Sequence, residues 1–432
     1  MTTEAPEAPA TAPPATHAGH EAGSPEHRRV VLALFAAGIA TFVLLYSTQA
    51  LFPLLADDFG VSRAASTWSL SATTAGLALA LLVVGPVSDR VGRTRIVHLS
   101  LAASTLVAAA CALAPTWPAL VGLRALQGVA LAGLPAVATA YLREELHPST
   151  QARAAGLYIG GTAVGGMAGR LVTGPVAEVA GWRWALAGAA ALGLGCAVVV
   201  RLLLPPSRGF VPAGAGARAA LRRARLAVSD PALLALYAVG ACAVGAFTAV
   251  FNTMGFRVEG APFHLGLGAA SLLFLVYPAG TVGSALAGRL ADRWGRRAVA
   301  PVGVLLALAG LALTLSDRLA VVVTGVAVLT AGFFVVHGLA SGWVPARAHA
   351  GRVAAGQAAS FYLFSYYLGA SGFGALAAHL WASDGWPGVT VLAASLLLAG
   401  GLLTLALRRL PVLAAASAGV PTLAAGGPAP RR

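Results

Sequence analysis

The sequence predicts an all-α integral membrane protein with twelve transmembrane helices arranged as two pseudo-symmetric six-helix bundles. Of its 432 residues, 58% are hydrophobic and only 10% are charged, and the mean hydropathy is +0.80, far above the values of soluble domains. Apolar windows of about 20 residues, the length that a helix needs to cross a bilayer, recur along the chain. A charged cassette at residues 85–95 (GPVSDRVGRTR) returns at residues 288–298 (GRLADRWGRRA), which indicates two related halves.

The predicted helices are apolar runs bounded by charged residues or by Pro and Gly clusters. They cover residues 30–54, 66–88, 96–114, 117–141, 151–177 and 182–204 in the first half, and 231–257, 266–288, 298–315, 318–343, 353–380 and 386–408 in the second. The domain organisation follows from these runs: a disordered cytoplasmic tail (1–27), the N-terminal bundle (28–204), a cytoplasmic linker (205–230), the C-terminal bundle (231–409) and a second disordered cytoplasmic tail (410–432).

The first tail is rich in Ala, Pro, Thr and His and carries four Glu, so it is too polar to pack and too acidic to begin a signal peptide. Arginine placement predicts the topology, since the chain has no Lys. With both termini in the cytoplasm, 23 Arg fall on the cytoplasmic side and four in outer loops. This distribution obeys the positive-inside rule and places both cassettes in the cytoplasm.

The two halves match beyond the cassettes. Gln49 corresponds to Asn252 at an offset of 203 residues, and Tyr158 corresponds to Tyr362 at an offset of 204. The pair Gly181–Trp182 likewise returns as Gly385–Trp386. Internal duplication explains these matches, and duplicated halves around a central site are a recurring design of secondary transporters.

Each cassette combines Gly for close helix approach, Asp to pair with Arg or a helix N-terminus, and Arg at the membrane boundary. We expect the cassettes to act as a conformational latch between the ends of the two bundles. A plain topology anchor would explain the Arg cluster but not the repeated Asp and Gly spacing. The latch candidates are Gly85, Asp89, Arg90, Gly92, Arg93, Gly288, Asp292, Arg293, Gly295 and Arg296.

The cassette resembles GxxxDRxGRR, the signature loop of the major facilitator superfamily, with Thr94 in place of one basic residue and a second copy that ends in Arg296 and Arg297. The stretch LRALQGVALA (123–132) is similar to the RxxQGxxxA signature of that superfamily's proton-driven exporters. The resemblance implies a role for Arg124 and Gln127 in proton coupling; alternatively, Arg124 snorkels to the outer interface as an anchor. The glycine-rich stretch 156–171 resembles the family's antiporter signature but lacks its central Gly-Pro pair.

Further segments, among them residues 46–62, 143–149 and 356–371, resemble the YnfM-like branch of bacterial inner-membrane transporters. That branch is grouped with sugar and drug exporters. The resemblance therefore implies residence in the inner membrane and efflux of a sugar-like or drug-like solute, although fold kinship does not establish function.

No carboxylate is predicted to lie in the middle of the membrane, where proton-driven transporters often hold one. The remaining candidates for proton coupling are Asp57 and Asp58, at the outer end of the first helix, and His337, within an apolar run. The alternative for His337 is an imidazole hydrogen-bonded to a neighbouring backbone or hydroxyl group.

Polar side chains inside the predicted helices are candidates for the substrate cavity, and we expect them to suit a neutral polar or mixed polar-aromatic solute. Arg170 either binds an anionic group of a substrate or pairs with Asp57 or Asp58. The tyrosines alternatively pack between helices. The cavity candidates are Gln49, Tyr158, Arg170, Asn252, Tyr362, Ser365 and Tyr366.

Other function classes are disfavoured. The Arg residues do not form one basic face, which argues against nucleic-acid binding. No catalytic motif or Cys/His metal motif is present, so we expect neither an enzyme nor a cofactor. The sequence therefore predicts a monomeric, proton-coupled exporter of a small molecule, embedded in the lipid bilayer. Uptake by symport and a membrane sensor without net flux remain the alternatives.

Overall fold

The computed structural model describes residues 19–210, 217–351 and 353–410, and every regular element in these ranges is helical. The helices of the first half are α1 (Pro25–Tyr46), η1 (Gln49–Leu51), α2 (Phe52–Phe59), α3 (Arg63–Ser66), α4 (Trp68–Val91), α5 (Arg93–Ala112), α6 (Trp117–Leu131), α7 (Gly133–Glu145), α8 (Pro148–Ala180) and α9 (Trp182–Leu203).

A connecting helix and the second half follow. Their helices are α10 (Ala217–Ala227), α11 (Pro231–Glu259), α12 (Leu267–Ser271), η2 (Leu272–Val276), α13 (Tyr277–Trp294), α14 (Arg296–Leu313), α15 (Leu319–Ala350) and α16 (Ala355–Ala406).

Ten helical stretches of the described chain are long and apolar enough to cross a membrane. α8 is not among them, because its glycines and arginines lower its hydropathy, yet it packs along α1 over the length of the bundle. α16 holds two spans, since its backbone leaves the helical region at Gly385 (φ 64°, ψ −151°). The ten stretches, α8 and the division of α16 give the twelve predicted spans of the all-α fold.

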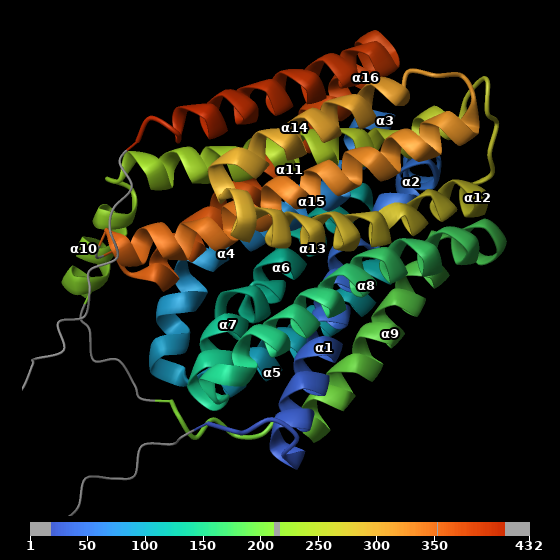
Figure 1. The fold of residues 1–432 in the computed structure, drawn as a ribbon. Helices are drawn as coiled ribbons and strands as arrows, with labels where there is room; N and C mark the ends of the chain where they lie inside the picture. Colours follow the sequence, from blue (N-terminus) through green and yellow to red (C-terminus); the bar gives the residue numbers. More distant parts are fainter. Residues whose placement is uncertain (1–18, 211–216, 352, 411–432) are drawn as a thin grey trace, which may run out of the picture.

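The two halves lie side by side in Figure 1, with α1 and α5–α9 in one bundle and α11 and α13–α16 in the other. They meet along α4 and α16 and along α8 and α12. We call the end that carries residues 85–95, residues 288–298 and α10 the cassette end. The end that carries α2, α3 and α12 is the far end.

Glycine makes the turn in each cassette. Gly92 ends α4 with φ 103°, and Gly295 ends α13 with φ 83°. Residues with a side chain rarely adopt this backbone, whereas Gly does so at no steric cost. The sequence repeat is therefore also a repeat of backbone conformation.

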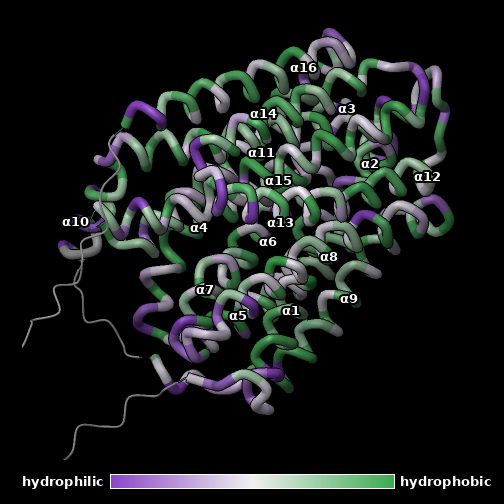
Figure 2. Tube along the Cα trace, in the orientation of Figure 1, coloured by the Kyte–Doolittle hydropathy of each residue, from purple (hydrophilic) through white to green (hydrophobic). Residues whose placement is uncertain are grey.

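Large apolar side chains cover the outside of the bundles. Val179 is 90% exposed, Leu113 80% and Leu202 76% in the protein alone. Figure 2 shows these apolar stretches along the spans, with hydrophilic residues gathered at the helix ends and on α10. Such a surface is stable against lipid tails and unfavourable in water. The protein is a multi-pass membrane protein.

The described residues before residue 28 make defined contacts. The backbone of His20 pairs with that of Glu145 and His147 (2.8 and 3.1 Å), and Ser24 caps α1 by accepting a hydrogen bond from the His27 backbone N–H. His20 is held by backbone partners in the connection between α7 and α8, and Ser24 by the first turn of α1. The remaining tail predictions, for residues 1–18 and 411–432, lie outside the described residues.

Candidate functional site

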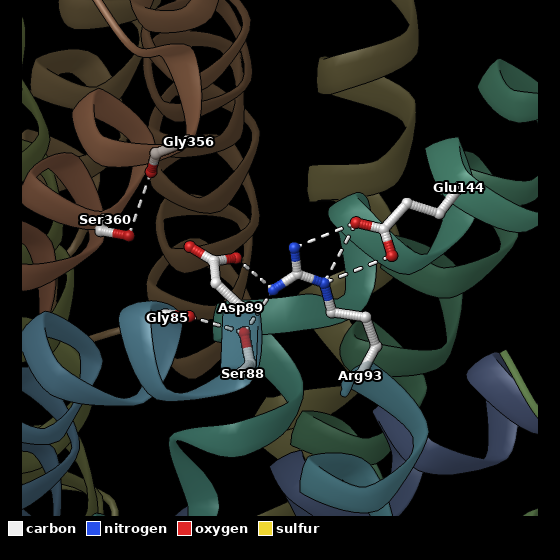
Figure 3. A network of polar contacts seen from close by, with 7 residues as sticks. All are labelled: Gly85, Ser88, Asp89, Arg93, Glu144, Gly356 and Ser360. Atoms are coloured by element: carbon white, nitrogen blue, oxygen red, sulfur yellow. Dashed lines mark hydrogen bonds and ion pairs between the residues drawn. The ribbon is translucent and has the colours of Figure 1, made fainter. Parts of the chain in front are cut away.

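The first cassette forms a charged network within the first half (Figure 3). Arg93, at the start of α5, pairs with Asp89 on α4 at 2.6 Å and with Glu144 on α7 at 3.0 Å. Arg93 also donates to the hydroxyl of Ser88. The network therefore joins the cassette ends of three helices. Gly85 faces the other half, where a Cβ at its position would lie 3.8 Å from Oγ of Ser360.

The second cassette is arranged differently. Arg296 donates to the backbone oxygen of Gly342 (3.1 Å), and Arg297 donates to that of Leu410 (2.9 Å). Asp292 and Arg293 are exposed, and within the described ranges neither makes an ion pair. The partners of both cassettes lie within their own halves. Of the latch candidates, Asp89 and Arg93 come together, whereas Arg90, Asp292 and Arg293 face solvent.

Arg124 lies where the first span breaks. α1 ends at Tyr46 and a short 3₁₀ turn precedes α2, so carbonyl groups at the break lack helical partners. Arg124 donates to the backbone oxygens of Leu44 (2.9 Å) and Leu45 (2.6 Å). It also bonds the backbone oxygen of Ser69 (2.8 Å) and the side chain of Gln127 (2.5 Å). Its side chain is only 1% exposed, so it holds the break in place and does not snorkel to the interface.

Gln49, Asn252 and Arg170 meet between the two halves. Gln49 follows the break and donates to Oδ1 of Asn252 on α11 at 2.5 Å, which joins the pair related by the sequence repeat. Arg170 of α8 donates to Oε1 of Gln49 and to the backbone oxygen of Gly166, both at 2.5 Å. Its guanidinium carbon lies 3.9 Å from the ring centre of Tyr46, 4.7 Å from that of Phe274 and 4.8 Å from that of Tyr277.

We call Tyr46, Phe274 and Tyr277 the aromatic cage. Tyr46 belongs to the first half, and the other two rings belong to the second.

The expected pairing of Arg170 with Asp57 or Asp58 is wrong. Asp58 instead accepts a hydrogen bond from Nε1 of Trp182 (2.7 Å) and lies 3.6 Å from Arg183, while Asp57 is exposed. The position of a residue in the sequence predicts its depth in the membrane, but not the side of the helix on which its side chain lies.

A second cluster lies within the second half. Nδ1 of His337 is 2.9 Å from the hydroxyl of Tyr362, and the imidazole ring lies 4.7 Å from the ring of Tyr366. His337 therefore has the neighbouring hydroxyl partner considered from the sequence. Ser365 is half-buried, and Tyr158 is buried in an apolar cluster of the first half. Neither belongs to the cluster around Arg170.

The halves are closed against each other toward the far end. Three hydrogen bonds join them in the described part of the chain: Gln49 to Asn252, Ser371 to the backbone oxygen of Ser71 (2.7 Å), and the Gly268 N–H to Glu178 (2.9 Å). A pocket between the halves is bordered here by Gln49, Asn252, Phe274 and Glu259 among others. One buried carboxylate oxygen of Glu259 has no hydrogen-bond partner among the described residues.

The sequence did not identify several residues of these sites. The aromatic cage lies in apolar runs whose pattern carries no signal for it. Glu259 follows an apolar run at the outer end of a predicted helix, where its position in the sequence does not distinguish it from other acidic residues at helix ends. Glu144 stands in the visible motif REELHPS, but its partner Arg93 is 51 residues away in sequence.

Comparison with known proteins agrees with this architecture. The family described as the Major Facilitator Superfamily matches residues 30–281. The chain is 39% identical to the inner membrane transport protein YnfM of Escherichia coli, over 85% of this chain and 87% of that protein. It is 36% identical to the MFS-type transporter YybF of Bacillus subtilis, over 85% of this chain and 90% of that one.

A solved structure has the same fold. The bacterial homologue of the human lysosomal transporter Spinster, in an inward-facing and occupied conformation, superposes with a TM-score of 0.69 at 15% identity, over 90% of this chain and 98% of that one. The match to the family, the two relatives over most of their length and the twelve-span fold agree. The chain belongs to the Major Facilitator Superfamily and is a secondary transporter.

Proposed function

We propose that this transporter exports a small organic solute in exchange for protons, with both termini and the cassette end in the cytoplasm. The arginine distribution supports this orientation, with 23 Arg on the cytoplasmic side and four in outer loops. Two bundles that rock around a central site expose it to one side at a time.

The observation that carries the proposal is the closure at the far end. The Gln49–Asn252 bond, the Ser371–Ser71 bond and the Gly268–Glu178 bond all join the halves there. In the proposed orientation these contacts seal the outer face, so the structure corresponds to an inward-facing state. To open outward, the halves break these contacts and close at the cassette end, where the first cassette, with its Asp89–Arg93–Glu144 network, serves as the latch.

A coupling proton must bind a group whose surroundings differ between the two states. Asp58 fails this condition, since its partners Trp182 and Arg183 move with it in the first half. Glu259 meets it, because its pocket is formed by both halves and changes when they part. We propose Glu259 as the proton site; His337 fails the same condition as Asp58, since its partners Tyr362 and Tyr366 lie in its own half.

Arg124 and Gln127 act indirectly in this proposal. The guanidinium of Arg124 donates hydrogen bonds to carbonyl groups at the break of the first span. Gln49 follows this break and reaches the other half. Its resemblance to the exporter signature supports the efflux direction, and the geometry gives it the role of positioning Gln49.

Everted membrane vesicles that contain the protein, energised to an acid interior, test the proposal. A pH-sensitive dye reports proton release as sugars, lipophilic cations and organic acids are added in turn. We expect one class to cause dye recovery in the wild type and not in Glu259→Gln. Asp58→Asn is the matched control, because it also neutralises an acidic residue at the same end. Arg124→Ala is unsuitable, since it removes five hydrogen bonds, three of them to Leu44, Leu45 and Ser47 at the break.

The other outcomes point to the alternatives. Solute accumulation in right-side-out vesicles, driven by an inward proton gradient, would replace export by uptake through symport. Solute binding without counterflow in reconstituted liposomes would indicate a sensor. If Glu259→Gln behaves like the wild type while transport remains proton-driven, Glu259 is not the coupling group.

A further inference from the structure

The buried charge in the middle of the spans is positive. Among the described residues, three charged side chains are buried: Arg124, Arg170 and Glu145. Glu145 lies at the cassette end of α7 and accepts hydrogen bonds from the backbone N–H groups of Arg208 and Gly209. The middle of the described bundle therefore holds two guanidinium groups and no buried carboxylate.

The two guanidinium groups differ in what surrounds them. Arg124 is bonded to three backbone carbonyls and one amide of the first half, so it acts as part of the helix framework. Arg170 is equally buried at 1% exposure, but its partners are the Gln49 side chain, one carbonyl and three aromatic rings. None of these carries a negative charge. Hydrogen bonds and ring faces stabilise the cation, yet its full charge remains uncompensated.

The cage around Arg170 is divided between the halves. Phe274 and Tyr277 belong to the second half, as does Asn252, which holds Gln49. When the halves part at the far end, Arg170 keeps Tyr46 and Gln49 but loses two of its three rings. An anion that binds Arg170 in this open state forms charged hydrogen bonds with it. These bonds stabilise the guanidinium more strongly than the lost ring faces do.

A pocket lies beside the aromatic cage. It is lined by residues of both halves, including Gln49, Asn252 and Phe274, each of which touches Arg170 or its partner. The charged member of its lining, Glu259, is at the far end of α11, near both the cationic Arg63 and the anionic Asp57. Arg170 is not part of this lining but adjoins it through Gln49 and Phe274, two residues that it contacts.

We propose that the transported solute is an organic anion with an aromatic or apolar body, whose carboxylate or sulfonate binds Arg170. Gln49 and Asn252 supply amide N–H donors to the same group, and Tyr46, Phe274 and Tyr277 pack on the body. Lipophilic cations are excluded by the uncompensated guanidinium. This inference rests on the proposed transport function and specifies its substrate class. It replaces the neutral polar or mixed polar-aromatic solute expected from the sequence and favours the alternative in which Arg170 binds an anionic group of the substrate.

A matched series of aromatic probes tests the charge requirement with the purified full chain. Benzenesulfonate is a permanent anion, benzenesulfonamide its neutral counterpart, and benzyltrimethylammonium a permanent cation. Binding is measured as a shift in melting temperature, and exchange as counterflow of labelled probe in liposomes without a pH gradient. We expect stabilisation and counterflow with benzenesulfonate and neither with the amide or the cation.

Variants then assign the effect to the site. Arg170→Gln should weaken binding of benzenesulfonate about tenfold to a hundredfold, the size expected for a lost charged hydrogen bond. Arg170→Lys should restore part of it, since the charge remains. Arg183→Gln, which removes a surface charge near Asp58, is the control and should bind as the wild type does. Melting temperatures without probe identify any variant that fails to fold. Tyr277→Leu should weaken benzenesulfonate more than methanesulfonate.

Two results overturn the inference: preference for the amide or the cation, or unchanged anion binding in a folded Arg170→Gln protein. Counterflow of a neutral or cationic solute would sustain the transport function while removing its anion specificity. Anion binding without exchange of any solute would preserve the Arg170 site and remove the transport function. The two failures are thus distinguishable.

Discussion

The two cassettes have nearly the same sequence and the same backbone turn but different electrostatic neighbours. In the first, Arg93 bridges Asp89 and Glu144. In the second, the position of Glu144 is occupied by Ala348 at the 204-residue offset, and the adjacent Arg347 pairs with Asp230 at 3.0 Å. The motif therefore specifies the turn, whereas the ion-pair network around Arg93 depends on Glu144, an acidic residue outside the motif.

The largest expected effect is the difference in transport between substitutions of the two cassette aspartates, Asp89 and Asp292. Asp89→Asn should reduce transport about tenfold while the protein remains in the membrane, because α4 loses its charged attachment to α5. Asp292→Asn should leave transport near the wild-type rate, since Asp292 is exposed and makes no ion pair within the described chain. Flux and membrane abundance are measured together for both variants. Equal losses in both would mean that the network is irrelevant to the latch.

The next prediction concerns the residue outside the motif. Glu144→Gln should lower the free energy of unfolding by about 2 kcal/mol, the contribution of hydrogen bonds between charged groups. Both partners are largely buried, with side-chain exposures of 11% for Arg93 and 24% for Glu144. Chemical denaturation of the purified protein measures the change. An unchanged stability would show that Asp89 alone holds Arg93.

The turn glycines should behave alike, in contrast to the aspartates. Gly92→Ala and Gly295→Ala each force a residue with a Cβ into positive φ, which costs about 1–2 kcal/mol. Neither new methyl group would clash, because the nearest atom to a Cβ at Gly92 is 3.8 Å away and none lies within 4 Å of a Cβ at Gly295. Gly122→Ala, where the space is open and the backbone helical, is the control. A large difference between the two variants would indicate that the backbone repeat is not equivalent in solution.

The smallest effect is expected at the exposed arginines. Arg90→Gln and Arg293→Gln should change neither transport nor stability beyond about 0.5 kcal/mol, the usual range for surface substitutions. Each alters one positive charge of a cluster that sets topology. Reporter fusions at the loops should show the orientation unchanged, and an inverted chain would show that a single Arg decides it.

The sequence predicted the architecture because hydropathy and repeats are properties of order along the chain. Twelve apolar runs and the matching glycines could be seen directly. The break after Tyr46 could not, since residues 46–54 continue an apolar run with only Ser47, Thr48 and Gln49 as polar interruptions. That break exposes the carbonyl groups that explain why Arg124 is buried.

The polar members of the candidate site around Arg170 were predictable, whereas its aromatic members and its arrangement were not. Gln49, Asn252 and Arg170 were visible as polar residues in apolar spans, and they meet. The partner expected for Arg170 was wrong, because opposite charge is the sequence's most obvious complement to Arg, whereas the actual partners are aromatic rings from two distant spans. The charge pattern of a sequence does not predict which aromatic rings will pack on a buried Arg.

The attachment of Glu145 to the start of the linker has a mechanical consequence. Because its carboxylate binds the N–H groups of Arg208 and Gly209, the tether between the halves starts from the first half only at Gly209. Part of what remains before Pro231 is α10, which advances about 1.5 Å per residue where an extended chain advances about 3.3 Å. The helix thus shortens the reach of the linker relative to an extended chain, and this reach sets an upper bound on how far the halves separate at the cassette end.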